Sequence, residues 1–335
     1  MKFDFRIYSI VSATIIGAVG AINWLIDPLW YGQGNRLTGQ NFAFNERISK
    51  TNQFLRTKTK NYDCLILGSS RVIMLRASQF EGENCFNYAF KGGSVDEFIE
   101  YAQFAKEQGL SPKTVYVGVD GYNFVKEEKF NKEGSQIEKV KQTSFFHAYF
   151  SLDVFTFSAM TLLGMSPGPA NYYNQNFEVE EFPNKPSYSP AFHPPQPPQE
   201  CDLSRVQLYQ QVQAIFPEAK IVGYVPPRSA WAVVNETYER DLMNCYIEGF
   251  YQVAQLYDRF YDFSIPSEMT KDPKNTWDGS HFSNAVNDQI AEMLGGQPMM
   301  FGIQVDQYSH EDYRLQYTQE LTTFMNDQGK LIVSH

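Results

Sequence analysis

Two short segments of the sequence carry the side chains that activate a serine. Residues 68–71 read Gly-Ser-Ser-Arg after a short apolar run, and residues 278–281 read Asp-Gly-Ser-His near the other end of the chain. A serine hydroxyl becomes a nucleophile when an imidazole takes its proton, and that imidazole needs an acceptor on its Nδ1 side. Asp278 lies three residues before His281 across a glycine turn and can be this acceptor. Nε2 of His281 is then left for Ser70.

Each segment also has a plainer interpretation. A serine between a strand and a helix commonly caps the helix, and an Asp-x-x-His spacing arises by chance in a chain of this length. The positions of the two segments favour a catalytic role for them. One segment follows the first expected strand, and the other precedes the last expected helix. The remaining histidines lack this context and are interpreted as structural or solvated: His147, His193, His310 and His335.

Further polar and glycine positions follow the next two expected strands. Gly92 and Gly93 come after the second strand, and Asp120 and Asn123 come after the third. Glycine lets a backbone N–H approach a ligand closely, so Gly93, or else Gly92, is expected to help hold an oxyanion. Arg71, beside the serine, is a further candidate for substrate binding. The alternative is ordinary turn chemistry, with Asp120 as a helix cap.

The elements that must position these residues alternate between strand and helix. Short apolar runs flanked by turn residues predict buried parallel strands, and such alternation is typical of a doubly wound α/β sheet. The predicted strands are residues 64–67, 85–90, 114–119, 219–225 and 260–263. The predicted helices are residues 46–60, 95–108, 203–216, 236–256 and 284–294. The carboxyl ends of parallel strands share one edge of a sheet, so the candidate residues are expected to meet there.

One long segment breaks this alternation. Residues 164–200 contain several prolines, including the pairs at 194–195 and 197–198, and many aromatic side chains. The segment is interpreted as a loop that is either a lid or a partner surface. Its rings could stack on sugars beside Ser70, or they could simply pin the loop to the domain.

The N-terminus predicts a membrane anchor. Residues 7–26 contain no charge and are long enough to span a bilayer as a helix, with Lys2 and Arg6 before them and Trp24 near their far end. The basic flank is expected to stay in the cytoplasm and the rest of the chain to lie outside it. A cleaved signal peptide, cut before Ala21, is the alternative.

Composition further limits the partners, metal ions and cofactors that the chain is expected to bind. The chain has 335 residues, a net charge of −10 and a pI near 5.1, which disfavours nucleic acid as a partner. The four cysteines lie far apart with no Cys-x-x-Cys pair, so no metal site is expected, and no cofactor either. Among disulfides we expect Cys201–Cys245 first, because a Cys64–Cys85 bridge would join adjacent parallel strands and be strained.

Taken together, these segments resemble the SGNH (GDSL-like) hydrolase superfamily over about residues 63–294. The serine block, the glycine after the second strand and the terminal Asp-x-x-His match in order. The resemblance implies a three-layer, flavodoxin-like, doubly wound parallel sheet. It also implies a triad of Ser70, His281 and Asp278, with the backbone N–H groups of Ser70 and Gly93 holding the oxyanion. One block departs, since Asp120 stands where the family has an oxyanion-donating Asn, unless Asn123 substitutes for it.

The chain is more closely similar to membrane-anchored SGNH-like proteins that modify envelope polymers, such as alginate acetylation proteins and DltD-like proteins. This resemblance implies an esterase or O-acyltransferase that acts on an acyl ester or a surface glycan, with a multi-pass membrane acyltransferase as partner. The alternative is a silent envelope component that keeps the fold and binds a glycan or that partner. The expected organisation is a cytoplasmic N-terminus (1–6), an anchor (7–26), a linker with a surface helix (27–60), the α/β domain (61–296) and an extension (297–335).

Overall fold

The computed structural model describes residues 5–126, 136–166, 171–181, 186–194 and 196–330. The chain divides into two compact units. Unit 1 comprises Met1–Thr59 with Ser135–Pro183, and unit 2 comprises Lys60–Gly134 with Asn184–His335. The predicted organisation treats residues 27–60 as a linker with one surface helix. In the structure, the residues up to Thr59 share a compact unit with a segment inserted between the strands of the α/β unit.

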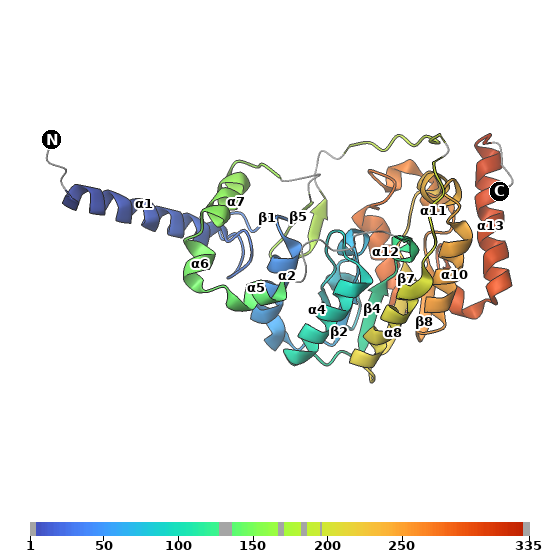
Figure 1. Ribbon diagram of the computed structural model, residues 1–335, viewed down its shortest axis with the longest axis horizontal. Coiled ribbons are helices and arrows are strands. Elements are labelled where there is room, and N and C mark those ends of the chain that lie inside the picture. The colour runs from blue at the N-terminus through green and yellow to red at the C-terminus, as the bar shows by residue number, and fades with distance from the viewer. Residues whose placement is uncertain (1–4, 127–135, 167–170, 182–185, 195, 331–335) are drawn as a thin grey trace. The chain divides into compact units, whose positions relative to one another are not determined.

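Unit 2 is built on a mixed α/β arrangement whose sheet has the strand order β3-β2-β4-β7-β8-β9. Figure 1 labels β2, β4, β7 and β8 of this sheet. Neighbours from β3 to β8 pair in parallel, and β9 runs antiparallel to β8. The strands are β2 (Cys64–Leu67), β3 (Cys85–Asn87), β4 (Thr114–Gly118), β7 (Lys220–Val225), β8 (Arg259–Asp262) and β9 (Ile303–Gln304). The five strands predicted from the sequence are confirmed, with ends that differ by a few residues.

Burial explains why these segments are strands. Every residue of β2 and of β4 is buried, which is the apolar pattern of parallel strands that are covered on both faces. Because the strands from β3 to β8 are parallel, the loops that follow β2, β4 and β7 leave the same edge of the sheet. This edge is where the candidate residues are found.

Helices follow most strands of unit 2. They are α3 (Ser70–Ile73), α4 (Val95–Glu107), α8 (Val206–Ile215), α9 (Ala230–Val233), α10 (Met243–Ala254), α11 (Glu268–Lys271), α12 (Asn284–Leu294) and α13 (His310–Asp327). The helix predicted over residues 236–256 begins only at Met243, so its first two turns were wrong. A π-helical turn, Val234–Tyr238, precedes it, and Asp241 has a φ of 57°, which no α-helix accommodates.

The described part of the C-terminal segment, residues 297–330, packs against the sheet of unit 2. β9 adds an antiparallel edge strand, and the buried Tyr313 of α13 donates a hydrogen bond of 2.7 Å to the buried carboxylate of Asp262. Burial raises the pKa of Asp262, although the hydrogen bonds from Tyr313 and Ser264 partly oppose the rise. The sequence missed this segment because its partner lies at the end of β8, far along the chain.

Unit 1 is mainly helical. Its helices are α1 (Phe5–Ile26), α2 (Glu46–Thr57), α5 (Ile137–Gln142), α6 (Phe145–Tyr149) and α7 (Leu152–Leu162). A small antiparallel sheet has the order β1-β5-β6, formed by β1 (Asn41–Phe42), β5 (Asn171–Tyr173) and β6 (Val179–Glu181). Among the described residues, α1 is the one helix that is long and apolar enough to cross a membrane.

The predicted loop over residues 164–200 is wrong in its first half. β5 and β6 form a hairpin there, in which Tyr173 and Phe177 are buried and their rings stack. The Tyr173 hydroxyl donates to Glu46 at 2.8 Å. Strands of three residues carry too little alternation to be seen in a sequence that is dominated by the prolines further along.

Two disulfides join the four cysteines. Cys201–Cys245 is confirmed, with its Cα atoms 5.7 Å apart. Cys64–Cys85 also forms, which corrects the expectation that adjacent parallel strands disfavour it. The register of β2 and β3 places these two residues directly opposite each other, with Cα atoms 4.2 Å apart.

Candidate active site

Ser70 lies at the carboxyl end of β2 and is the first residue of α3. The hydroxyl of Ser69 accepts a hydrogen bond of 3.3 Å from the Arg71 backbone N–H and so caps this short helix. The plainer interpretation of the segment as a helix cap therefore applies to Ser69. The Ser70 side chain is free of that task and is only partly buried.

Two glycines allow the turn to sit close to the sheet. A Cβ atom on Gly68 would lie 2.3 Å from a methyl group of Val72, and one on Gly118 would lie 2.2 Å from the same methyl group. Val72 is fully buried, so its position is fixed by packing rather than by local preference. Gly68, which directly follows β2, and Gly118, which ends the neighbouring β4, thus allow α3, and with it Ser70, to lie against the edge of the sheet.

The Asp278-Gly279-Ser280-His281 segment forms a tight turn before α12. One Asp278 oxygen accepts from the backbone N–H groups of Ser280 at 2.8 Å and His281 at 2.7 Å. Gly279 has a φ of 83°, which a glycine adopts without strain. The Trp277 ring stacks against the His281 ring, with centroids 5.8 Å apart. The carboxylate and the imidazole are thus oriented by the backbone of their own turn.

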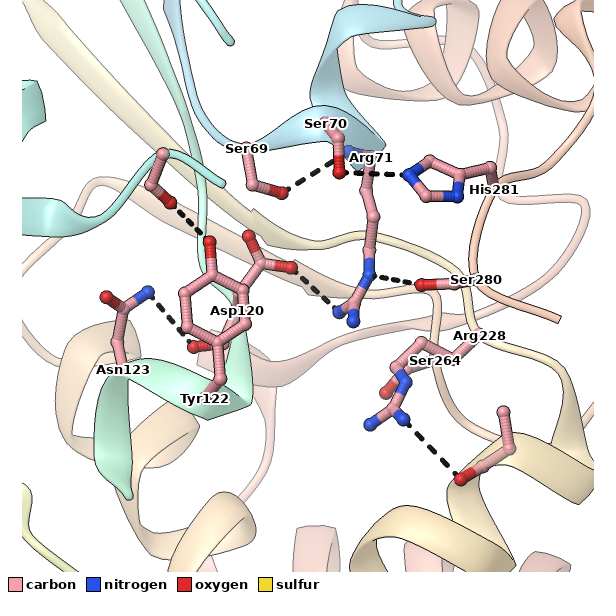
Figure 2. A network of polar contacts seen from close by, with 12 residues as sticks. Ser69, Ser70, Arg71, Asp120, Tyr122, Asn123, Arg228, Ser264, Ser280 and His281 are labelled. Atoms are coloured by element: carbon pink, nitrogen blue, oxygen red, sulfur yellow. Dashed lines mark hydrogen bonds and ion pairs between the residues drawn. The ribbon is translucent and has the colours of Figure 1, made fainter. Parts of the chain in front are cut away.

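The two segments meet in one hydrogen-bonded chain. His281 Nδ1 lies 2.6 Å from the second Asp278 oxygen. On its other side, His281 Nε2 lies 2.9 Å from Ser70 Oγ, a contact that Figure 2 shows. Burial alone would raise the pKa of Asp278, but the hydrogen bond and charge of His281 and the turn's N–H groups outweigh it and lower the pKa. An ionised carboxylate, an oriented imidazole and a hydroxyl in this order can pass a proton from serine to imidazole.

Arg71 reaches across the carboxyl edge of the sheet from the residue after Ser70. Its Nη1 lies 2.8 Å from the fully buried carboxylate of Asp120, and its Nε donates to Ser280 Oγ at 3.0 Å (Figure 2). Arg71 therefore links the loops that follow β2 and β4 to the turn that carries His281. Its positive charge also offsets the negative charge of Asp120.

The predicted oxyanion donors are placed less favourably. The Gly93 N–H donates to the Phe90 carbonyl at 3.1 Å. Asn123 is buried; its amide nitrogen donates to the Asp120 carbonyl at 3.2 Å, and its oxygen accepts from the Val95 N–H at 3.3 Å. Gly92 has a φ of 59°, and a Cβ atom there would meet open space.

The amide of Ser70 differs from these donors. As the first helical residue it has no intrahelical acceptor, so it remains a donor that points from the helix start. Gly93 nevertheless needs to be glycine, because a Cβ atom would lie 2.9 Å from the Gly68 carbonyl oxygen beside the serine turn. Gly93 thus lies next to the turn that carries Ser70, but its backbone N–H donates to the Phe90 carbonyl.

Sequence reasoning missed two residues around this site, Arg228 and Ser229, whereas a third, Tyr188, is one of the aromatic side chains of the predicted loop. Tyr188, in the second half of the predicted loop, covers Gly279, where a Cβ atom would lie 2.6 Å from its hydroxyl oxygen. The Ser229 N–H donates to the Gly279 carbonyl at 2.8 Å and pins the same turn. Arg228 is buried and forms an ion pair with Glu236. Arg228 and Ser229 follow the end of β7. Residues that follow parallel strands lie at the carboxyl edge of the sheet, so this position in the sequence could have indicated both residues.

A second cluster of ligand-type side chains lies at the start of β2 and β3. The side chains of Cys64, Glu83 and Cys85 lie within 4.8 Å of one another. The two sulfurs are joined in a disulfide, and the Glu83 carboxylate accepts from Thr114 at 2.6 Å and Tyr116 at 2.8 Å. A bridged cysteine offers no thiolate, so this donor set does not suit a metal ion.

Comparison with known proteins adds little to this geometry. No family model and no curated protein matches the sequence. Two solved structures are similar in outline. One, provisionally described as a platelet activating factor from Streptococcus pneumoniae, has 12% identity and a TM-score of 0.37, over 74% of this chain and 90% of its own. The other, provisionally described as an acylhydrolase from Bacteroides fragilis, has 10% identity and a TM-score of 0.34, over 72% and 94%.

Proposed function

We propose that this protein is a serine acyl-ester hydrolase or O-acyltransferase whose nucleophile is Ser70. The observation that supports it most is the unbroken chain from Asp278 through His281 to Ser70, with contacts of 2.6 and 2.9 Å. These distances are within the range for a nucleophile and its general base, and the base is held by a third group. The residues come from opposite ends of the chain, so their meeting is not a local accident.

In the proposed reaction, Ser70 Oγ attacks the carbonyl carbon of an acyl ester while His281 Nε2 takes the serine proton. The tetrahedral intermediate collapses, the C–O bond of the ester breaks, and the imidazolium gives its proton to the leaving alcohol. The acyl group then remains on Ser70. Attack by water returns a carboxylic acid, whereas attack by a sugar hydroxyl transfers the acyl group to a glycan. Asp278 stabilises the imidazolium in both halves of the cycle.

The groups near Ser70 favour a slow acylation reaction, because they would stabilise an oxyanion poorly. Asp120 holds a carboxylate where the resembling family has a donor, and the Gly93 N–H is already bonded to Phe90. The ion pair with Arg71 removes the net repulsion that an isolated carboxylate would exert. The Ser70 N–H is then the donor that this site supplies most directly, and one lost donor slows related enzymes by about 10²–10³-fold.

The same observation favours a second candidate. A chain that keeps the fold but lacks oxyanion donors could serve as a silent envelope component that binds a glycan or a membrane acyltransferase. The discriminating feature is whether Ser70 becomes acylated at all. A silent component has no use for the orientation that Asp278 gives to His281.

We further propose an SGNH-like, three-layer fold and a single-pass anchor. The order of the parallel strands in unit 2, numbered along the chain within that sheet, is 2-1-3-4-5, which is the flavodoxin-like order. α1 would cross the membrane with its basic flank in the cytoplasm, and unit 2 would act on a surface polymer outside it. A multi-pass acyltransferase in the same membrane would supply the acyl group.

Acylation of Ser70 by a small activated acetyl ester tests this function. The full-length chain in detergent is mixed with p-nitrophenyl acetate, quenched in acid and digested. The expected result is an acetyl group on the peptide that contains Ser70. The same treatment of Ser70→Ala should leave that peptide unmodified, and acetylation of surface lysines alone would support the silent candidate.

A further inference from the structure

Exposed apolar side chains of unit 1 gather on α1, on α6 and α7, and just beyond α7. On α7, Leu152 and Leu162 are 73% and 54% exposed, and the next residue, Leu163, is 72% exposed. Phe146 of α6 is 72% exposed and its ring stacks on Phe150. A folded unit surrounded by water rarely leaves so many large apolar groups uncovered in one region.

The spacing shows that these residues share one side of α7. Leu152, Phe155, Ala159 and Leu162 follow one another at intervals of three or four residues, which places them on one face of a helix. The buried residues, Val154 and Ser158, lie on another face. A third side, with Asp153, Thr156 and Phe157, lines a cavity of about 570 Å³ inside unit 1. The face formed by Leu152, Phe155, Ala159 and Leu162, called here the outward face of α7, is therefore apolar. The exposed Asp153 and Thr156 lie on the cavity side.

Three hydrogen bonds fix the position of this face along α1. The fully buried amide of Asn23 donates to the carbonyls of Tyr149 at 2.8 Å and Ser151 at 3.1 Å, and its oxygen accepts from Ser158 at 3.0 Å. One turn earlier, a Cβ atom on Gly20 would lie 2.6 Å from the Phe150 ring. Figure 1 shows α6 and α7 beside the C-terminal end of α1.

Helix length then sets the depth of these contacts. A bilayer core of about 30 Å takes about 20 helical residues, which matches residues 7–26 after the charged Arg6. Gly20 and Asn23 would lie about 10 Å and 5 Å inside the far boundary of that core. Whatever packs against them must enter the membrane with them, and a polar Asn at that depth needs partners such as those that Tyr149, Ser151 and Ser158 supply.

We propose that α6 and α7 are immersed in the outer boundary of the lipid bilayer, with the outward face of α7 and Phe146 against lipid. The inference rests on the proposed role of α1 as a membrane-spanning anchor. It goes beyond that role, because the protein is then held by three helices and not by a flexible single span. Unit 1 sits on the membrane as a platform, and its cavity opens next to the lipid headgroups.

The disulfides make a clean test possible. Since all four native cysteines are paired, a thiol-reactive NBD fluorophore labels only a cysteine that is introduced. Full-length variants Leu152→Cys and Leu162→Cys are labelled and placed in nanodiscs whose lipids carry a nitroxide quencher near the headgroup. Ile10→Cys, in the first half of α1, reports whether α1 is inserted, with the quencher near the end of the acyl chain. Gln175→Cys, in the exposed turn between β5 and β6, is the control.

We expect the fluorophores on Leu152→Cys and Leu162→Cys to lose most of their emission with the shallow quencher, while Gln175→Cys keeps its emission. If Ile10→Cys is quenched but both α7 positions remain as bright as Gln175→Cys, the immersion of α7 is wrong, whether that face is bare or covered by a second copy. If Ile10→Cys is not quenched either, the anchor itself is wrong, and the inference falls with it.

Discussion

Arg71 Nη1 lies 2.8 Å from the carboxylate of Asp120, and this ion pair involves the residue directly after Ser70. Asp120 is fully buried and Arg71 is only 13% exposed, so water screens the pair weakly. Arg71 also donates to Ser280, within the turn that orients His281. One ion pair thus ties the geometry of the triad to the charge of the site.

Removing one partner of this pair should be costly. Arg71→Met leaves a buried carboxylate without its partner, and we expect the free energy of unfolding to fall by about 3–5 kcal/mol. Asp120→Asn combined with Arg71→Met should recover much of that loss, because no charge is then left buried. Denaturant unfolding of Arg71→Met, Asp120→Asn and the double variant measures the coupling. Losses that simply add would show that the two side chains do not stabilise each other.

The turn that carries His281 should be sensitive to a single methyl group. Gly279→Ala forces an alanine into a positive φ and places its Cβ atom against the Tyr188 hydroxyl, so we expect slower acylation of Ser70. Tyr188→Ala removes both the hydroxyl oxygen and the ring carbon that would lie 2.8 Å from the new Cβ atom, but not the backbone strain. The double variant should therefore recover part of the rate, which stopped-flow acylation measures. No difference between the single and double variants would show that Tyr188 does not press on this turn.

Lys50 should make stability depend on pH. It is fully buried in unit 1, and burial lowers its pKa to about 7, although the charge of Glu46 opposes the shift. Between about pH 7 and its ordinary pKa of 10.5, the unfolded chain holds a proton that the folded chain lacks. The free energy of unfolding should therefore rise from pH 7 toward pH 10.

Lys50→Met should lack this rise. Trp30 is buried in the same unit, so thermal unfolding followed by tryptophan fluorescence can report it. Parallel pH profiles for the variant and the parent chain would show that Lys50 is not the group responsible.

Reduction should weaken unit 2. The Cys201–Cys245 bridge joins residues 44 apart, and Cys64–Cys85 joins residues 21 apart. Loop-closure entropy gives about 3–4 kcal/mol for each bridge, so a reductant should lower the melting temperature of unit 2 markedly. Cys201→Ser with Cys245→Ser should reproduce part of the effect without reductant. Free thiols at all four positions in non-reducing peptide mapping would contradict both bridges.

The sequence predicted the parallel core and the meeting of Ser70 with His281 for the same physical reason. Strands such as residues 64–67 are buried on both faces and read as apolar runs, and the residues that follow them meet at one edge of the sheet. Ser70 and His281 could therefore be brought together without knowledge of any contact. The glycines around Val72, by contrast, show their purpose only once the packing is seen.

What the sequence could not show depends on distant partners or on very short elements. Arg71 was a candidate, but nothing local indicates that its charge is paired with Asp120. β5 and β6 are three residues long, and β9 is two. Unit 1 was not predicted, because its two halves are far apart in the sequence. Residues 60–134, which carry strands of unit 2, lie between residues 1–59 and residues 135–183.

The most direct test is covalent labelling of the folded, full-length chain with a fluorophosphonate probe, which reacts with activated serines. Labelling should occur on Ser70, disappear in Ser70→Ala and slow by about 10³–10⁴-fold in Asp278→Asn, where the imidazole loses its orientation. Ser69→Ala, which removes the neighbouring cap but not the nucleophile, should still be labelled. A folded parent chain that takes up no probe, or equal labelling of Ser70→Ala, would contradict a catalytic serine at this position.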